Sequence, residues 1–393
     1  MKHLVGPRYP PAAILAAVLP SPDPATALAT LRTVASPPTA PFHEQRVLHA
    51  IAGELDRRGI AWHTDGHGQV FGRMAQGTAK RALAFVAHTD HPAFDVVETN
   101  GTRGVAKVRG GLQERCFRDP VPVIVHHDDG AAPFPATLDR FTAEIELPDW
   151  SPGYCRITAD RPLRVGAWAV MDLPDLEVKG RELHLRAADD LAGVAVILCA
   201  LDALRGADRA FDVHCVFTRA EESGLFGARL IAAEGSIPAD AYVVSLEASN
   251  ARYAPAGAGP VVRVGDYHNT FSNEAEQYLR VAQERLLERG RPVQRALLPG
   301  GTCEASAFVR LGWTATGVAL PNVGYHNAPM NENDDRFVPE IIDREDYLSA
   351  ILLLAEAALA AGSDESESWW PDVQSMPPEI AARLGPLDPT SRR

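Results

Sequence analysis

The spacing of apolar residues predicts alternating helices and strands over most of the chain. Between residues 41 and 60, apolar side chains recur at helical spacing, and the continuous apolar run Ala82–Ala87 is typical of a buried strand. Further along, predicted helices cover Leu191–Leu204, Phe226–Glu234, Asn273–Arg289 and Asp346–Ala361, and predicted strands cover Phe211–Thr218 and Ala241–Leu246. This alternation indicates a largely parallel sheet with helices on both faces.

The stretch from about residue 100 to residue 180 has a different pattern. Short apolar runs such as Val121–Val125 are separated by Gly, Pro and Asp, and no helical spacing persists, which favours a small β-rich module. We therefore expect an α/β fold, with a mixed, mainly parallel sheet between helices, interrupted by an inserted β-barrel-like domain. The expected division is 1–99 with 181–361, then 100–180 for the insert and 362–393 for a tail. Trp369 and Trp370 of the tail are expected to pack on the core, with a neighbouring chain as the alternative.

The composition of the 393-residue chain is that of a folded protein with an acidic charge balance. Acidic residues outnumber basic ones 51 to 38, which argues against a nucleic-acid partner. The five scattered cysteines favour reduced thiols and a cytoplasmic location. No apolar run reaches the roughly 18 residues of a membrane span. The short apolar run Ala12–Leu19 is interpreted as a packed helix, with an export signal as the alternative.

Polar residues at the ends of predicted strands are the first candidates for chemistry, because open α/β sheets bind ligands there. His88 and Asp90 follow the run Ala82–Ala87, so an imidazole can bind a metal while a nearby carboxylate fixes its ring. Asp189 and Asp190 stand just before a predicted helix. They are candidate cation ligands, although a helix N-cap is the favoured explanation when they are taken alone.

Two more strand ends carry acids, and one loop carries a histidine. Glu221 and Glu222 follow the strand Phe211–Thr218; one carboxylate can bind a metal while its neighbour remains a base, and a solvated acidic turn is the alternative. Glu247 ends another apolar strand and needs a partner if it is buried. His326 follows a further apolar run. Together, these histidines and carboxylates suit a pair of divalent ions.

The order of these motifs resembles the co-catalytic di-zinc aminopeptidase and carboxypeptidase clan, and within it the tetrahedral, or deblocking, aminopeptidase family. The order is His-x-Asp, Asp-Asp, Glu-Glu-x-Gly, an acid and then His. The position of the β insert, between Asp90 and Asp189, is similar to that family, as are the segments 259–266 and 300–302. The resemblance covers roughly residues 35–360.

The resemblance implies a role for each candidate residue. His88 and Glu247 would bind one metal, Glu222 and His326 the other, and Asp189 would bridge both. Asp90 would orient His88, Glu221 would be the general base, and the Asp189–Asp190 peptide would be cis. The ions would be two zinc ions, with cobalt or manganese as alternatives, and the insert would mediate a homo-oligomer, from dimer to dodecamer.

Three positions depart from the family's usual pattern. His91 stands where Glu usually follows His-x-Asp, Glu247 where Asp is usual, and Cys303-Glu304 where Asp usually follows Gly-Gly-Thr. Glu at position 247 is more typical of the clan's carboxypeptidases and deacylases.

The function expected from the resemblance is removal of N-terminal residues from peptides by a hydroxide shared between the ions. An N-acyl amino acid deacylase or carboxypeptidase on the same scaffold is the second hypothesis. A non-catalytic binding or assembly protein that retains the fold is the third. No Gly-x-x-x-x-Gly-Lys or Gly-x-Ser-x-Gly motif supports a phosphate-loop or serine enzyme.

Overall fold

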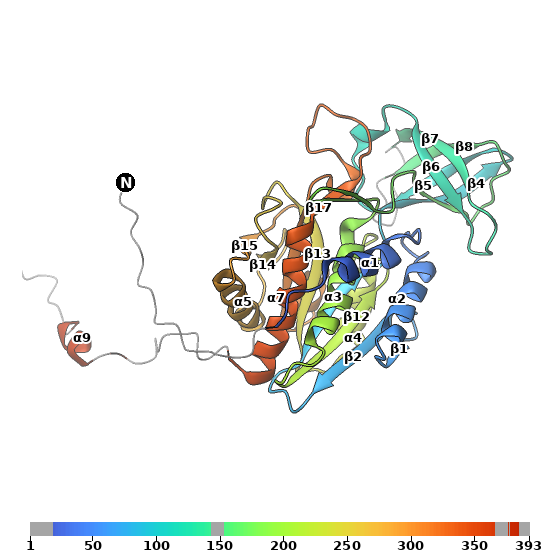
Figure 1. Cartoon of the computed structure of the whole chain (residues 1–393). Helices are drawn as coiled ribbons and strands as arrows, with labels where there is room; N and C mark the ends of the chain where they lie inside the picture. Colours follow the sequence, from blue (N-terminus) through green and yellow to red (C-terminus); the bar gives the residue numbers. More distant parts are fainter. Residues whose placement is uncertain (1–18, 143–152, 366–375, 377, 385–393) are drawn as a thin grey trace, which may run out of the picture.

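A mixed eight-stranded sheet forms the centre of the protein (Figure 1). The computed structural model describes residues 19–142, 153–365, 376 and 378–384. The strand order is β1-β2-β12-β3-β13-β16-β14-β15. In chain order, the bounds are β1 Trp62–Thr64, β2 Val70–Gln76, β3 Leu83–His88, β12 Phe211–Thr218, β13 Tyr242–Asn250, β14 Val261–Gly265, β15 Gln294–Leu297 and β16 Ala315–Asn322.

The inner strands of this sheet are parallel. β12 pairs with β3, β3 with β13, and β13 with β16, whereas β2 and β14 join the inner strands in antiparallel orientation. The carboxyl ends of β3, β12, β13 and β16 therefore meet at one edge of the sheet. Side chains that follow these strands are brought together there, although they lie far apart in the sequence.

Helices cover both faces of the sheet because the inner strands are apolar on both sides. Along β3, Leu83 and Phe85 pack into one core, and Ala84 and Val86 into the other. The first core contains α1 (Pro24–Ala35), α2 (Gln45–Arg57), α3 (Ala188–Leu204), α5 (Asn273–Glu288) and α7 (Arg344–Ser363). The second contains α4 (Phe226–Glu234) and α6 (Glu304–Arg310).

A closed barrel extends from the carboxyl edge of the sheet and has its own apolar core (Figure 1). Its strand order is β4-β5-β8-β7-β6-β9. The bounds are β4 Ala93–Asn100, β5 Arg103–Arg109, β6 Val121–His126, β7 Phe134–Thr142, β8 Tyr154–Ala159 and β9 Trp168–Met171, with a short 3-10 helix, η1, at Glu114–Phe117. A small sheet of β10 (Glu177–Lys179), β11 (Glu182–Leu185) and β17 (Glu340–Asp343) lies between the barrel and the main sheet (Figure 1).

The expected fold class, a mixed and mainly parallel sheet between helices with an inserted β-barrel, is confirmed. Most expected elements differ from the observed ones by only a few residues. Helices α1 and α6 and strands β1, β14 and β15 are among the observed elements without an expected counterpart. The N-terminal run Ala12–Leu19 falls almost wholly outside the described residues, and Trp369 and Trp370 lie outside them. In the tail, a short helix, α9, covers Pro378–Arg383.

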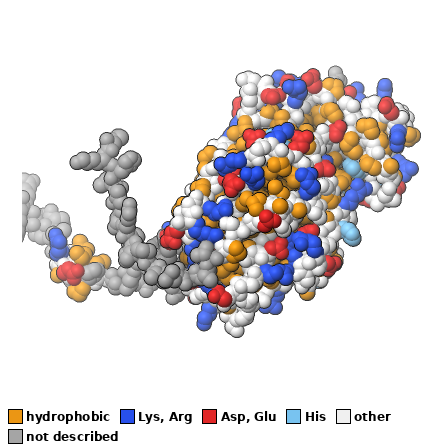
Figure 2. Space-filling view, in the orientation of Figure 1, with side chains coloured by type: hydrophobic (Ala, Val, Ile, Leu, Met, Phe, Trp, Pro, Cys, Tyr) orange, Lys and Arg blue, Asp and Glu red, His pale blue; other side chains and the backbone are white. Residues whose placement is uncertain are grey.

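Helix α7 is long and apolar enough to cross a membrane by length and composition, but 94% of its most apolar window is buried inside the protein. It packs on α3 and α5, which accounts for its apolar surface. On the face seen in Figure 2, acidic and basic side chains are interspersed with apolar ones. All five cysteines are free and buried.

Arg58, at the end of α2, joins three helices in the first core. Its guanidinium contacts Glu54 on α2, Asp202 on α3 at 2.8 Å, and the hydroxyl of Thr30 on α1 at 3.1 Å. Only 4% of Arg58 is exposed. We predict that Arg58→Ala destabilises the protein by about 3–5 kcal/mol, because it leaves the Glu54 carboxylate without its buried partner.

The neighbouring Arg57 provides the matched control, since it pairs with the same Glu54 but its side chain is 52% exposed. Arg57→Ala should cost less than about 1 kcal/mol. Urea unfolding curves of the two variants measure both effects. Equal losses of unfolding free energy in the two variants would contradict the interpretation that Arg58 is the buried residue that connects the three helices.

Candidate metal centre

The predicted site residues converge at the carboxyl edge of the sheet. His88 is the last residue of β3, Glu221 and Glu222 lie in the turn after β12, and Glu247 lies in β13. Asp189 comes from the first residues of α3, and its peptide bond to Asp190 is cis. His326 lies in a short 3-10 helix, η2 (Tyr325–Asn327), just after β16.

The side-chain atoms of these residues form two neighbouring groups. Nε2 of His88 lies 3.5 Å from Oδ1 of Asp189 and 3.8 Å from Oε2 of Glu247. Nε2 of His326 lies 3.4 Å from Oε1 of Glu222 and 3.6 Å from Oδ2 of Asp189. Asp189 therefore offers one oxygen to each histidine. In each group, one ligand atom per residue lies within 4.8 Å of the others, as metal ligands must. His88, Glu221 and Glu222 form a third combination within the same limit.

Several atoms in this cluster are buried without a hydrogen-bond partner in the described part of the chain, which tests whether the residues fit a metal. They are Nε2 of His88, Oε1 of Glu222 and Oε1 of Glu247. Buried polar atoms of this kind are costly unless something compensates them. Nitrogen and carboxylate donors facing one another suit divalent cations, zinc among them. The donor set therefore fits divalent metal ions.

The carboxylates of the cluster favour the binding of positive charge. Burial acts to lower the pKa of His326, but the carboxylates of Glu222 and Asp189 outweigh it and raise that pKa to about 10. Burial likewise opposes protonation of His88, and the carboxylate of Glu221 leads those that raise its pKa. Burial raises the pKa of Glu222 to about 7 and also raises the pKa of Glu221 and Glu247. In the metal-free protein, bound protons thus neutralise the negative charge that a metal ion would otherwise neutralise.

Asp90 contacts both His88 and the turn that follows β12. Its carboxylate accepts hydrogen bonds from the backbone N–H groups of Glu221 and Glu222, at 3.0 Å each. Nδ1 of His88 lies 3.2 Å from the backbone carbonyl of Asp90. Asp90 therefore fixes both the imidazole and the turn that carries the two glutamates. From the other side, buried Glu44 accepts from the N–H of Ala220 at 3.0 Å.

Glu340 is a buried acid that the sequence pattern did not single out. Its Oε1 accepts from the N–H of His326 at 2.8 Å, and its Oε2 accepts from the N–H of Asp189 at 2.9 Å. It therefore ties the bridging aspartate to the histidine of the second group. The available signal was the same as for Glu247, namely an acid beside the apolar residues Ile341 and Ile342.

His91 has a structural explanation for its departure from the family pattern. Its Nδ1 lies 2.6 Å from the backbone carbonyl of Asp189, and its Nε2 lies 2.9 Å from Oδ1 of Asn327. Burial lowers the pKa of His91 to about 4. His91 thus connects the backbone of Asp189 to the residue after His326.

Glu304, another departure, is a fully buried acid behind the cluster. Its Oε1 accepts from the hydroxyl of Thr218 at 2.5 Å, and burial raises its pKa to about 8. Asp190 also stays behind the ligand groups, where its Oδ1 accepts from the N–H of Gly193 at 3.1 Å. The helix-cap interpretation therefore holds for Asp190, while Asp189 faces the histidines.

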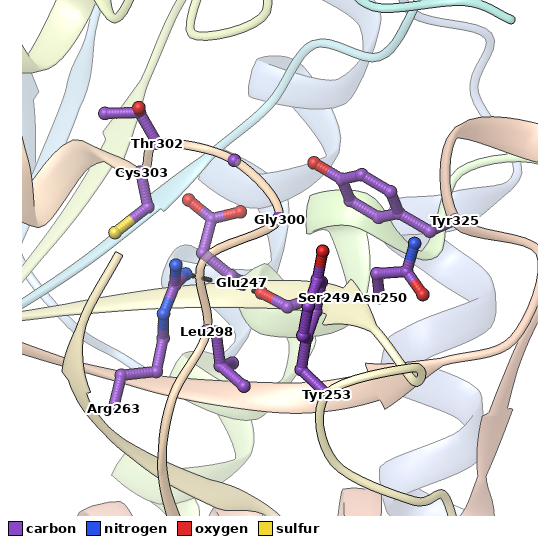
Figure 3. Close-up of a pocket in the computed structure, with 11 residues that line it drawn as sticks. Glu247, Ser249, Asn250, Tyr253, Arg263, Leu298, Gly300, Thr302, Cys303 and Tyr325 are labelled. Carbon is purple, nitrogen blue, oxygen red and sulfur yellow. Dashed lines mark hydrogen bonds between the residues drawn. The ribbon is translucent and has the colours of Figure 1, made fainter. Parts of the chain in front are cut away.

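A polar pocket adjoins Glu247 (Figure 3). Arg263 supplies the cation of its lining, and NH1 of its guanidinium lies 3.3 Å from the hydroxyl of Ser249. The rings of Tyr253 and Tyr325 stand on the opposite side from Arg263 in Figure 3. The remaining lining residues are Asn250, Leu298, Gly300, Gly301, Thr302 and Cys303.

The pH dependence of stability without metal depends on these buried acids. Burial raises the pKa of both Glu304 and Glu340 from 4.5 to about 8. Both carboxyl groups bind protons more tightly in the folded than in the unfolded state, so their contribution is full below about pH 4.5 and is lost as the pH rises toward 8. Urea midpoints of metal-free protein should therefore fall between about pH 5 and pH 8.

Glu304→Gln should make that fall shallower, because the amide keeps the acceptor for Thr218 and cannot ionise. Glu274→Gln, on the exposed first turn of α5, is the control and should keep the wild-type slope. Parallel curves for wild type and Glu304→Gln would contradict the assignment.

Comparisons with known proteins found one family model and several solved structures that are similar to this chain. The family model described as M42 glutamyl aminopeptidase matches residues 158–336. No curated protein sequence matches. An aminopeptidase from the archaeon Desulfurococcus kamchatkensis shares the fold with a TM-score of 0.71 at 20% identity, over 90% of this chain and 99% of that one.

Two further solved structures share the fold at 18% identity. A TET aminopeptidase from a marine-sediment thaumarchaeote has a TM-score of 0.72 over 88% of this chain and 99% of that one. A TET peptidase from Pyrococcus horikoshii has a TM-score of 0.67 over 85% of this chain and 99% of that one. The family match and the shared fold confirm the resemblance to the tetrahedral aminopeptidases and support a metal-dependent aminopeptidase.

Proposed function

We propose that the protein is a two-metal aminopeptidase that removes N-terminal residues from peptides. The observation that carries the proposal is the position of Asp189, with one carboxylate oxygen facing His88 and the other facing His326. His88 and Glu247 would hold one ion, Glu222 and His326 the other, and Asp189 both. The family match and the fold of the archaeal aminopeptidases support this interpretation.

The side chains of the site divide the chemical work. Two divalent ions, zinc in our proposal, would supply Lewis-acid catalysis by acidifying a water and polarising the scissile carbonyl. Glu221 would accept the proton of the attacking water on its carboxylate and pass it to the leaving amine. Its Oε2 lies 3.9 Å from Nε2 of His88, so the carboxylate stands at the edge of the first group. The surplus of carboxylates suits the cationic amine of a peptide N-terminus.

Glu221→Gln should lower kcat by about 10²- to 10⁴-fold, since the amide cannot accept the proton. Metal analysis should still find two ions per chain. Glu222→Gln is the matched control and should lose metal, because it replaces a proposed ligand. Wild-type turnover in the Glu221→Gln protein would exclude Glu221 as the base.

The pocket beside Glu247 is proposed to receive the side chain of the N-terminal residue. Arg263 is 3% exposed, and its Nε has no hydrogen-bond partner among the described residues, so a carboxylate of the substrate would meet an incompletely paired guanidinium. We therefore propose a preference for N-terminal Glu or Asp, which the description of the matching family as glutamyl aminopeptidase supports. Tyr253 also lines this pocket and is 44% exposed, so we propose that its side chain moves when the substrate enters.

Aminoacyl substrates with Glu, Gln and Leu side chains test this preference, and their N-acyl counterparts test the deacylase alternative. We expect cleavage of the free-amine substrates only, with Glu preferred over its isostere Gln. Arg263→Met should reduce the ratio of kcat/KM for Glu to that for Gln by about 10- to 100-fold. This corresponds to the loss of one hydrogen bond to a charged group, which is worth about 1.5–3 kcal/mol. Arg263→Lys is the control that retains a cation. An unchanged Glu-to-Gln ratio in Arg263→Met would refute the assignment.

Assembly and location are proposed on the same basis. The Pyrococcus horikoshii peptidase is described as assembling into a tetrahedron or a large octahedral shell. We propose that this chain likewise forms a homo-oligomer, with the inserted barrel as the dimerisation or lid domain. We also propose that residues 1–99 and 181–361 form the catalytic domain and that the protein is cytoplasmic.

A further inference from the structure

The loop after His326 is attached to the barrel. This loop, residues 328–339, joins η2 to β17. Arg115, in η1 of the barrel, donates from its guanidinium to the carbonyls of Pro329 at 2.8 Å, of Asn331 at 3.3 Å, and of Asp334. One barrel side chain therefore holds three successive parts of the loop.

Apolar contact reinforces this attachment. Phe117, also in η1, belongs to the barrel core and meets the ring of Phe337 edge-on, with centroids 5.0 Å apart. At its far end the loop returns to the site, where the N–H of Val338 donates to the carbonyl of Asn327 at 2.9 Å. The backbone that carries His326 is thus held between the barrel and β17.

The barrel also contacts the imidazole of His326 directly. Nδ1 lies 2.8 Å from the carbonyl of Gly111, two residues beyond the end of β5. A carbonyl only accepts, so Nδ1 carries a proton, and Nε2 is the nitrogen left to bind an ion beside Glu222 and Asp189. The barrel therefore sets the tautomer of this histidine.

His88 has a different support. Its Nδ1 faces the carbonyl of Asp90, in the segment directly after β3. The two histidines of the site consequently depend on different parts of the protein, His88 on the sheet and His326 on the barrel.

We propose that the barrel segment 110–117 is a positioning element for His326, and that it sets the affinity of the second metal position independently of the first. Gly111 and Arg115 are its positioning residues. The inference rests on the proposed two-metal site. It adds that docking of the barrel, through these contacts, determines whether the Glu222–His326 position is filled.

Stepwise titration of metal-free protein with Zn²⁺ by calorimetry tests this proposal. In Arg115→Ala, the affinity of one of the two binding steps should fall by about 10- to 100-fold, the usual effect of removing a group that supports a ligand. The other step should stay within about twofold of wild type. Arg118→Ala is the matched control, because Arg118 lies just after η1, is 71% exposed and meets the same loop through Asp335 at 3.5 Å; both of its steps should match wild type.

Gly111→Ala provides a second variant that keeps Arg115 and decides the matter if Arg115→Ala does not fold. An added methyl group would lie 3.1 Å from Nδ1 and 3.3 Å from Cε1 of His326, so it should displace the ring and weaken the same step. Gly66→Ala, where a methyl group meets nothing within 4 Å, is its control. Two wild-type steps in Gly111→Ala, or equal weakening of both steps, would overturn the proposal. A wild-type protein that binds no Zn²⁺ would overturn the two-metal function with it.

Discussion

Repulsion among buried carboxylates is the constraint on which the site depends. Asp189, Glu221, Glu222 and Glu247 converge within a few ångströms, and Glu304 and Glu340 are buried behind them. Like charges at this separation cannot all ionise without compensation. The high pKa of His326 and the raised pKa of Glu222 record that cost. Divalent cations relieve it, so the same arrangement that strains the metal-free protein creates its affinity for metal.

A second layer of backbone contacts makes this arrangement reproducible. Asp90 accepts from the two N–H groups of the glutamate turn, and Glu340 accepts from the N–H groups of Asp189 and His326. Each of these two carboxylates thereby holds two backbone N–H groups in place. The positions of the ligands consequently depend on the backbone around them, which the sheet and barrel hold in place.

Local periodicity makes part of the site predictable from the sequence, whereas contacts between distant residues leave no such signal. His88, Glu221 and Glu247 could be found because apolar strands precede them and parallel strands bring their ends together. Glu340 contacts Asp189 across 151 positions, and Gly111 contacts His326 across 215. No spacing rule connects such pairs. The unusual residue at His91 was visible in the sequence, but its bond to the carbonyl of Asp189 required the fold.

The register of the sheet places the two proposed ligands of the first ion, His88 and Glu247, opposite each other. Backbone pairing between β3 and β13 runs from Leu83 opposite Tyr242 to Val86 opposite Ser245, so His88 and Glu247 are the opposed positions two residues beyond the last pair. An ion bound by both side chains would connect the two strands beyond the point where their backbone hydrogen bonds end. Removal of metal would then let these two strand ends separate before the rest of the sheet opens, and exchange of the ion would proceed through that local fraying.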